Sequence, residues 1–339
     1  MPPQSNTRPK IRTRLTDLLG IEHPILCGGL MHLADANYVA AVVNAGAMGF
    51  ISALTFPDPK QLGDEIQKCR DLSGGKPFGV NLYISPRQDA NDRLEKLLTV
   101  VRNEQVAVVE TAGGNPGPII PYMKEAGIKV IHKVPTVRFA LSAERAGVDA
   151  ISLVGAECGG HPGYMMVGSM VQAADAPQKL SVPVILGGGI GHGSQLTAAL
   201  AMGCDGILMG TRMLVSSELQ AHRDYKQRVV EGTGLDSIVV QSKLKNHHRV
   251  LDNQTARAVL ALENEGRESY EDYAHLLSGQ LAQEAYASGN TDQGLLDYGQ
   301  SACFAYAIEP VETIITQFME QAHTAIEQVE NLSRRSISS

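Results

Sequence analysis

Eight short apolar runs, each followed by a turn and a helical segment, predict an α/β protein with a (β/α)8 barrel, the TIM barrel fold. The runs are 21 to 32 residues apart and begin near Pro24, Met48, Phe78, Val106, Lys129, Ala150, Val182 and Gly206. Each spacing fits one strand and one helix of a parallel sheet. Eight consecutive units most simply close into a barrel, and an open doubly wound sheet is the less favoured alternative.

Glycines mark the ends of the predicted barrel helices. The Ala- and Val-rich residues 34–45 stop at Gly46, and two further helical segments stop at Gly147 and Gly203. Glycine adopts the left-handed conformation that ends many helices. We therefore expect helices that end just before these three glycines.

The barrel pattern stops after Glu218. Residues 219–300 are polar and helical, with runs at 256–265 and 270–286 and without further strand signals. We expect this segment to form an inserted helical cap domain, with residues 1–218 and 301–339 forming the barrel domain.

The C-terminal segment carries one long amphipathic pattern. Apolar residues recur at helical spacing from Val311 to Val329, directly behind Glu309 and Pro310. Such a stripe is typical of a helix that packs on a core, and Pro is favoured at the start of a helix. We expect the helix to return to the barrel, although a homodimer would explain the stripe equally well.

Composition excludes several classes of protein. The 339 residues are 43% hydrophobic and 19% charged, as in an ordinary globular chain, and the net charge of −7 gives no reason to expect a nucleic-acid partner. The five cysteines are widely spaced without a Cys-x-x-Cys pair, which indicates a reducing compartment and neither disulfides nor a zinc knuckle. We find neither a secretory signal nor an apolar stretch long enough to span a membrane, and therefore expect a cytoplasmic protein.

The active site of such a barrel is expected at the C-terminal ends of the strands. Gly187-Gly-Gly-Ile-Gly191 follows the seventh strand and precedes a helix starting near Gly193, and Gly210-Thr211 follows the eighth. Backbone N–H groups at this place often hold a phosphate, whereas tight turns are the simpler explanation for either loop alone. A Walker pattern is absent, and the Rossmann glycine pattern is met only loosely.

Two side chains at the strand ends are candidates for chemistry. His161 lies in the glycine-rich loop after the sixth strand, a place poorly suited to core packing. Lys133 ends the fifth strand, where it would act as a Schiff-base nucleophile, as a partner for an anionic cofactor, or simply as a solvated lysine. His132 faces the other side of its strand and is expected to be structural. His247 and His248 are adjacent, not at ligand spacing, so we expect no metal site.

The motifs together resemble those of the nitronate monooxygenase family, also called 2-nitropropane dioxygenase, with its NAD(P)H:quinone reductase branch. They are HPILCGGLM, FGVNLY, VVETAGG, KVIHKV, ECGGHPG, LGGGIGHG and ILMGTR, followed by LKNHHRVLDN in the cap and Asp297-Tyr-Gly-Gln300. Each motif alone is weak, whereas their order and spacing cover nearly the whole chain. The resemblance implies an FMN-dependent barrel with a helical cap.

The resemblance also implies roles for individual residues. His161 corresponds to the catalytic histidine of the family, and Lys133 would lie near the N1/O2 edge of the flavin. The remaining predicted cofactor contacts are Gly29, Leu30, Met31 and Asn81 at the ring, Gly159 and Gly160 beside His161, and Gly188, Gly189, Gly210 and Thr211 at the phosphate. Some relatives carry a carboxylate near the flavin on the sixth strand, where this chain has Leu153 and Val154.

The leading hypothesis is a nitronate monooxygenase that uses O2. His161 would take the α-proton of a nitroalkane and, once protonated, hold the nitronate. One alternative is an NAD(P)H:quinone reductase, in which His161 only shapes the pocket. Another is a flavin enoyl-acyl-carrier-protein reductase, whose carrier phosphate would meet a basic cluster that could equally be a solvated helix face; the cluster comprises Lys243, Lys245, His247, His248 and Arg249. A flavin-binding scaffold without turnover is disfavoured, because His161 and Lys133 are both present.

Overall fold

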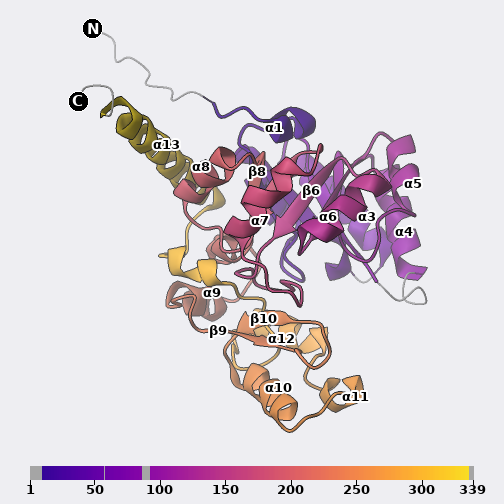
Figure 1. The fold of residues 1–339 in the computed structure, drawn as a ribbon. Coiled ribbons are helices and arrows are strands. Elements are labelled where there is room, and N and C mark those ends of the chain that lie inside the picture. The colour runs from indigo at the N-terminus through magenta and orange to yellow at the C-terminus, as the bar shows by residue number, and fades with distance from the viewer. Residues whose placement is uncertain (1–9, 57, 86–91, 336–339) are drawn as a thin grey trace.

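Eight parallel strands close into a barrel in chain order, which confirms the predicted fold class (Figure 1). The protein is described from a computed structural model that covers residues 10–56, 58–85 and 92–335. The strands are β1 (Ile25–Cys27), β2 (Met48–Ser52), β3 (Gly79–Ile84), β4 (Val108–Gly113), β5 (Lys129–Val134), β6 (Ala150–Val154), β7 (Val184–Gly187) and β8 (Gly206–Met209). β1 pairs with both β2 and β8, so the sheet has no free edge.

Helices surround the barrel and follow its strands. They are α2 (Ala36–Asn44), α3 (Pro59–Leu72), α4 (Asp92–Asn103), α5 (Ile120–Glu125), α6 (Val137–Ala146), α7 (Ser169–Asp175) and α8 (Gly193–Ala201). Short 3-10 turns follow β2, α7 and β8 at Ala53–Thr55, Ala176–Gln178 and Thr211–Val215. The three predicted terminal glycines all adopt positive φ, with Gly147 as the cap of α6 and Gly46 and Gly203 one residue beyond the caps of α2 and α8.

The barrel interior is apolar on the side of the N-terminal ends of the strands. Alternate strand residues point inward and pack as one cluster: Leu26, Met48, Phe50, Val108, Ile131, Ala150, Val154, Ile185 and Leu208. Leu15 and Leu19 of α1 (Arg14–Leu19) join this cluster at the N-terminal ends of the strands. The helix α1 therefore closes the N-terminal end of the barrel.

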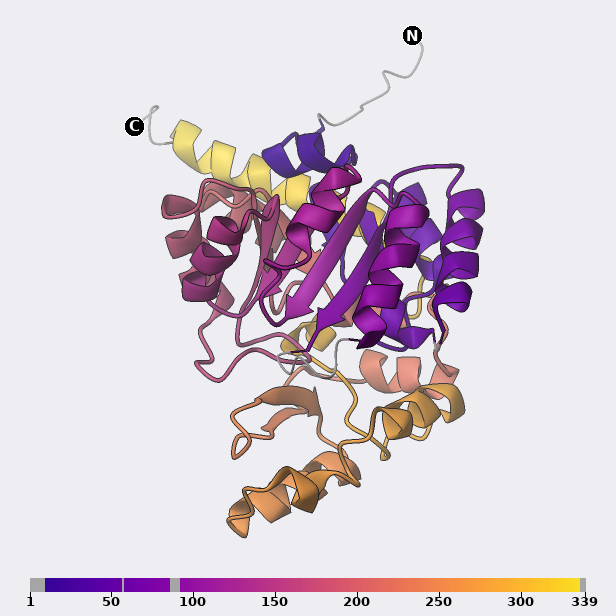
Figure 2. The same ribbon diagram turned by 90° about the vertical axis from the view of Figure 1, so that its right-hand side faces the viewer.

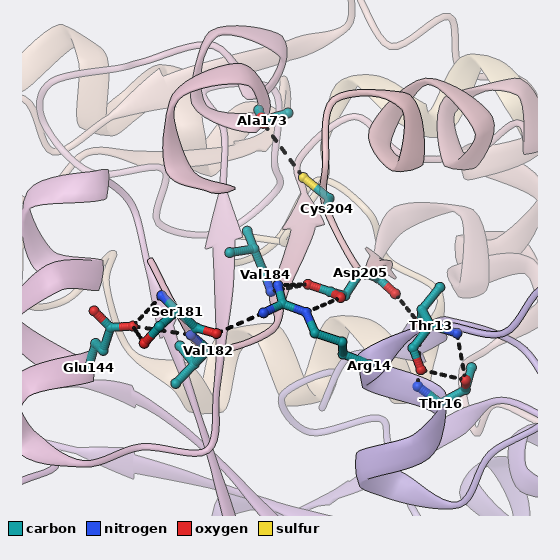
Figure 3. A network of polar contacts seen from close by, with 10 residues as sticks. All are labelled: Thr13, Arg14, Thr16, Glu144, Ala173, Ser181, Val182, Val184, Cys204 and Asp205. Carbon is teal, nitrogen blue, oxygen red and sulfur yellow. Dashed lines mark hydrogen bonds and ion pairs between the residues drawn. The ribbon is translucent and has the colours of Figure 1, made fainter. Parts of the chain in front are cut away.

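Polar contacts hold α1 in that place (Figure 3). The Arg14 guanidinium donates through Nε and Nη2 to the Asp205 carboxylate, at 2.8 and 2.7 Å. The same carboxylate accepts the backbone N–H of Val184 at 3.0 Å, at the start of β7. Because Asp205 is buried, this paired geometry both satisfies its charge and fixes α1 against the strands.

The long helix α13 (Val311–Arg335) returns to the barrel, as predicted. It packs on α8 so closely that a Cβ at Gly193 would stand 2.0 Å from the carbonyl oxygen of Phe318. Gln321 Oε1 accepts the N–H of Gly193 at 2.9 Å. Figure 2 shows α13 running away from the cap, beside the barrel.

The cap contains a small sheet that the sequence did not reveal. Its elements are α9 (Arg223–Val230), β9 (Ser237–Val240), β10 (His248–Leu251), α10 (Gln254–Asn264), α11 (Tyr270–Tyr273) and α12 (Gly279–Ser288), with a 3-10 turn at Gln300–Phe304. The expectation of a cap without strands is therefore wrong, since β9 and β10 form an antiparallel pair. A strand of four residues is too short to show the alternation of apolar and polar residues that predicts a strand. β9 and β10 are stabilised by each other and by neighbouring loops. The domain boundaries stay a prediction.

The predicted helical run at 270–286 is interrupted. α11 ends at Tyr273, and α12 begins behind Ser278, whose hydroxyl accepts the N–H of Gln280 at 3.3 Å.

All five cysteines are unpaired. Among the described residues, every helix is too short or too polar to cross a lipid bilayer.

His132 packs between the barrel and its helices, on the opposite face of β5 from Lys133, as predicted. Its ring is buried, and Nδ1 lies 2.8 Å from the hydroxyl oxygen of Thr111. Burial, together with the nearby charge of Lys133, lowers the pKa of His132 to about 4. The folded protein therefore holds this histidine neutral at pH values where an unfolded chain takes up a proton.

We predict that His132 makes the protein sensitive to mild acid. Because its pKa is lowered on folding, stability is lost as the pH falls from about 6.5 toward 4, by about 2 kcal/mol between pH 7.5 and 5.0. Urea unfolding of wild type and His132→Asn at these two pH values measures the difference. The variant should lose about 2 kcal/mol less on acidification than wild type. The control His275→Asn alters an exposed cap residue and should behave as wild type, and equal losses in all three proteins would contradict the prediction.

Candidate active site

The C-terminal ends of the barrel strands point toward the cap (Figure 2). The loops that leave these ends carry the glycines and the candidate side chains predicted from the sequence. The cap closes over one part of this face, because Gly160 of the β6–α7 loop pairs with Arg249 of β10. The candidate site therefore lies between β10 and the rim of the barrel at the C-terminal ends of its strands.

A buried carboxylate binds two polar side chains in the barrel interior, near the C-terminal ends of the strands. Glu110 of β4 is fully buried, and its Oε2 accepts from Nδ2 of Asn81 at 2.6 Å and from Nζ of Lys133 at 3.1 Å. Asn81 stands opposite Glu110 in the register of β3 and β4. One acidic side chain thus brings together two of the predicted cofactor contacts, from β3 and β5.

Sequence reasoning missed Glu110. The signal was present, because an acidic residue two positions after Val108, in an otherwise apolar strand, must face the barrel interior. Its second oxygen, Oε1, and the hydroxyl of Ser152 are buried and form no hydrogen bond with any described residue. Buried polar atoms without a partner mark places where a ligand supplies the missing bond.

The β1–α2 loop lies over this polar layer. A Cβ at Gly29 would stand 2.4 Å from the Cβ of Asn81, so only glycine lets the loop come this close. Met31 is exposed, and Leu30 is half-buried. His32 adopts φ 65°, and its Nδ1 lies 2.7 Å from Nε2 of Gln283 in α12, which joins the loop to the cap.

Three glycines after β7 and β8 form a backbone cradle. Gly188 and Gly189 adopt φ values of 96° and 71°, and a Cβ at either would stand 2.6 to 3.0 Å from Gly155 or Glu157, whereas a Cβ at Gly210 would meet no atom within 4 Å. Within the described ranges, the N–H groups of these three glycines donate no hydrogen bond to the protein. Free N–H groups beside open space are suited to an anion such as a phosphate.

The start of α8 contributes less to this cradle than the sequence predicts. The N–H groups of Gly191 and His192 donate to Oε1 of Gln195, at 2.8 and 2.9 Å, and that of Gly193 donates to Gln321. These donors are therefore occupied by side chains of the protein. The hydroxyl of the buried Thr211 likewise accepts the N–H of Gly299, at 2.9 Å.

The loop that carries His161 is fastened to the cap. Gly160 donates to the carbonyl of Arg249 at 2.9 Å and accepts from its N–H at 2.7 Å. A Cβ at Gly159 would stand 2.8 Å from the backbone nitrogens of Tyr298 and Gly299. Close packing explains Gly159, and a positive φ of 84° explains Gly160. Contact of either glycine with a cofactor stays a prediction.

His161 stands beside a second histidine that the sequence did not place in the site. Its ring stacks on that of His248, with centroids 4.3 Å apart and planes 13° from parallel. His248 Nε2 lies 2.6 Å from Oδ1 of Asp297. Loss of water around the ring between the loop and the cap, followed by the effect of the neighbouring His248, lowers the pKa of His161 to about 4. His161 is therefore neutral near pH 7. The residue as a whole is nevertheless exposed.

Asp297 lies among three imidazoles. Burial alone would raise its pKa, but the hydrogen bond with His248 and the charges of His248, His161 and His32 outweigh burial and lower it. Asp297 is therefore ionised near neutral pH.

The predicted basic cluster of the cap does not form one surface. Lys243 and Lys245 are exposed on the turn between β9 and β10, whereas His248 and Arg249 are buried against the β6–α7 loop. The expectation of a solvated helix face is wrong, because the segment forms a turn followed by β10, whose four residues are all buried. A phosphate site at the exposed Lys243 and Lys245 stays a prediction. Among the described residues, no group of three or more His, Cys, Asp and Glu side chains could hold a metal ion.

Comparison with known families assigns the chain. The model of the family described as nitronate monooxygenase matches residues 12–321, which includes the whole barrel and the cap. The chain belongs to the nitronate monooxygenase family. A probable nitronate monooxygenase of Staphylococcus aureus is 27% identical, over 91% of this chain and 97% of its own length.

Other proteins of similar sequence have different names. An indene-carboxyl-CoA dehydrogenase of Mycobacterium tuberculosis is 35% identical over 71% of this chain, and the match spans 66% of the length of that dehydrogenase. The solved structure of FabK from Thermotoga maritima superposes with a TM-score of 0.87 at 35% identity, covering 95% of this chain and 99% of FabK. This nitronate monooxygenase family member thus shares its barrel and cap with proteins that differ in name, and its own site residues must indicate its chemistry.

We predict that Glu110 and Lys133 are energetically coupled in this family member. Glu110→Leu leaves the Lys133 ammonium without its partner and should lower the free energy of unfolding by about 3 to 5 kcal/mol. Adding Lys133→Met removes the stranded charge, so the double variant should recover most of that loss. Urea unfolding of the two single variants and the double variant measures the coupling. Additive losses would contradict the prediction.

Proposed function

We propose that this protein is an FMN-dependent nitronate monooxygenase that oxidises alkyl nitronates with O2 to carbonyl compounds and nitrite. The observation that carries the proposal is the Glu110–Lys133 pair, which fixes an ammonium near the C-terminal end of β5. A fixed ammonium inside the rim of a barrel is suited to an anionic cofactor and its reduced, negatively charged form. The match to the nitronate monooxygenase family model supports the substrate class.

The residues present fit a flavin mononucleotide. Gly188, Gly189 and Gly210 offer N–H groups without a partner among the described residues, and Gly210 also faces open space that could hold the phosphate. Gly29 and Asn81 would lie against the ring. Asn81 gives its amide nitrogen to Glu110, which leaves its carbonyl oxygen free to accept from a ligand N–H. When bound, FMN supplies the electron-accepting ring that the protein's own side chains lack.

Lys133 has two tasks in this proposal. Its bond to Glu110 holds the ammonium in one position, and its side chain is still 23% exposed toward the site. The two N–H groups not used by Glu110 can then donate to a ligand oxygen or nitrogen that gains negative charge.

His161 is the residue that we propose to meet the substrate. With its pKa lowered to about 4, the ring is neutral at pH 7 and carries one proton. This differs from the expected protonated ring that holds a nitronate by charge. A neutral ring either accepts a proton or donates one hydrogen bond, depending on its tautomer.

A thioester substrate is a second candidate. The dehydrogenase of Mycobacterium tuberculosis that is 35% identical to this chain is named for a CoA substrate. Lys243 and Lys245 are exposed on the turn next to Asn246, whose side chain reaches His161 at 3.3 Å. Two lysines at the mouth of the site would attract the phosphates of CoA.

We predict that Gly210→Ala weakens FMN binding without disturbing the fold. The new methyl group meets no protein atom within 4 Å and therefore occupies the space proposed for the phosphate. Titration of apoprotein with FMN should show a Kd at least about tenfold higher, while the free energy of unfolding changes by less than about 0.5 kcal/mol. Gly63→Ala, in α3, is the matched control and should leave the Kd unchanged. An unchanged Kd for Gly210→Ala would remove Gly210 from the phosphate site.

Substrate tests on the reconstituted holoenzyme decide among the functions. An alkyl nitronate should drive O2 uptake with release of nitrite, whereas NAD(P)H under anaerobic conditions should leave the flavin oxidised. Rapid bleaching by NAD(P)H followed by turnover of a quinone, without nitrite release from nitronate, would establish a quinone reductase instead. Turnover of an acyl-CoA, lost on Lys243→Gln/Lys245→Gln, would establish the thioester candidate.

A further inference from the structure

A chain of side-chain hydrogen bonds runs from Asp297 to His161 through the cap. His248 Nε2 lies 2.6 Å from Asp297 Oδ1, and His248 Nδ1 lies 3.2 Å from Nε2 of Gln241. Gln241 Oε1 accepts from Nδ2 of Asn246 at 3.1 Å, and the same Nδ2 lies 3.3 Å from Nε2 of His161. The carboxylate is thus linked to the active-site imidazole by one imidazole and two amides.

The backbone of the β9–β10 turn is shaped to hold the two amides. Gln241 and Lys245 both adopt left-handed φ values, of 62° and 52°, although neither is glycine. Such conformations are uncommon outside glycine and persist where surrounding contacts maintain them. Here they turn the buried Gln241 and the neighbouring Asn246 toward the two histidines.

The direction of the bonds follows from the chemistry of the amides. An amide nitrogen only donates and an amide oxygen only accepts, so the N and O atoms are assigned by the bonds they make. Gln241 Nε2 therefore donates to His248 Nδ1, and His248 donates from Nε2 to Asp297. Asn246 Nδ2 donates to Gln241 Oε1 and to His161 Nε2. Each group in the chain then has a partner of the right kind.

We propose that Asn246, held by Gln241, fixes the tautomer of His161 with its proton on Nδ1. Nε2 of His161 receives the Asn246 N–H and has no room for a proton of its own. Nδ1 has no hydrogen-bond partner among the described residues, so it is the nitrogen that a ligand can meet. Asn246 and Gln241 are positioning residues in this scheme, and they act through His161.

The opposite orientation of the two amides defines the alternative protonation state of the hydrogen-bond chain. If both amides turn over, His248 carries a proton on each nitrogen and donates to Gln241, and Asn246 presents its oxygen to His161. Nε2 of His161 would then carry the proton, and Nδ1 would offer a lone pair as a base. The two states differ in the tautomer of His161 and in the charge of His248.

The proposal limits what His161 does, and this consequence rests on the proposed function. An Nδ1–H group donates a hydrogen bond to the negatively charged oxygen of a nitronate. It has no lone pair with which to remove a proton from a neutral nitroalkane. His161 should therefore assist the oxidation of a nitronate supplied as the anion, without generating that anion.

The tautomer is measured directly by nitrogen NMR on protein labelled with ring-15N histidine. His161 is assigned by the signal that disappears in His161→Gln, and long-range proton couplings identify the protonated ring nitrogen. At pH 7.5 the expected result is one proton, on Nδ1. A proton on Nε2, or on both nitrogens, would overturn the proposal. This measurement needs neither FMN nor a substrate.

Asn246→Asp tests the same point through activity. A carboxylate only accepts, so it should move the His161 proton to Nε2 and leave Nδ1 as a base. The ratio of neutral nitroalkane to nitronate turnover at pH 7.5 should rise at least about tenfold over wild type, which corresponds to about 1.4 kcal/mol.

Asn264→Asp is the matched control for Asn246→Asp. It makes the same chemical change at an exposed cap residue, the last of α10, without touching His161, and it should keep the wild-type ratio. An unchanged ratio in Asn246→Asp, or an equal rise in the control, overturns the proposal. If no variant oxidises nitronate, the proposed function fails, whereas the NMR result still decides the tautomer.

Discussion

The burial of one carboxylate constrains the candidate site more than any other feature. Glu110 is wholly enclosed by the barrel, so its charge must be matched by donors that approach from neighbouring strands. Asn81 and Lys133 meet this need, at 2.6 and 3.1 Å. In doing so they lose the freedom to point elsewhere, and their remaining polar atoms face the rim of the barrel. The position of an ammonium at the base of the site thus follows from the electrostatics of an interior acid.

The upper wall of the site depends on the cap in a similar way. Gly160 exchanges two backbone hydrogen bonds with Arg249, which places His161 against His248 and the β9–β10 turn. A histidine on a barrel loop therefore has its surroundings decided by residues almost ninety positions further along the chain. The small sheet of the cap supplies the rigid edge that makes this placement reproducible. Barrel and cap together, and neither alone, define the environment of His161.

Proteins that are similar to this chain have different names. The Mycobacterium tuberculosis dehydrogenase and the Thermotoga maritima FabK structure are each 35% identical to this chain, over 71% and 95% of it, whereas a probable nitronate monooxygenase is 27% identical over 91% of it. Overall sequence identity to these relatives therefore does not indicate which of their activities this chain shares. The residues that we propose for the substrate site, His161 with its amide partners and Lys133 with Glu110, would carry the discriminating information.

The sequence by itself determined the barrel, because eight apolar runs at regular spacing have few other ways to bury their surface. It also determined the glycine-ended helices, the return of α13 and the strand ends that carry Lys133 and His161, since these follow from local periodicity and from which end of a parallel strand faces the site. Only the tertiary structure decided the partners. Glu110 became a central residue through its register with Asn81 and its ion pair with Lys133. The Asp297–His248–Gln241–Asn246 chain was assembled from segments that are short, polar and distant in sequence. Such contacts leave no periodic trace, because they arise from how separate elements pack and from the need of buried polar atoms for partners.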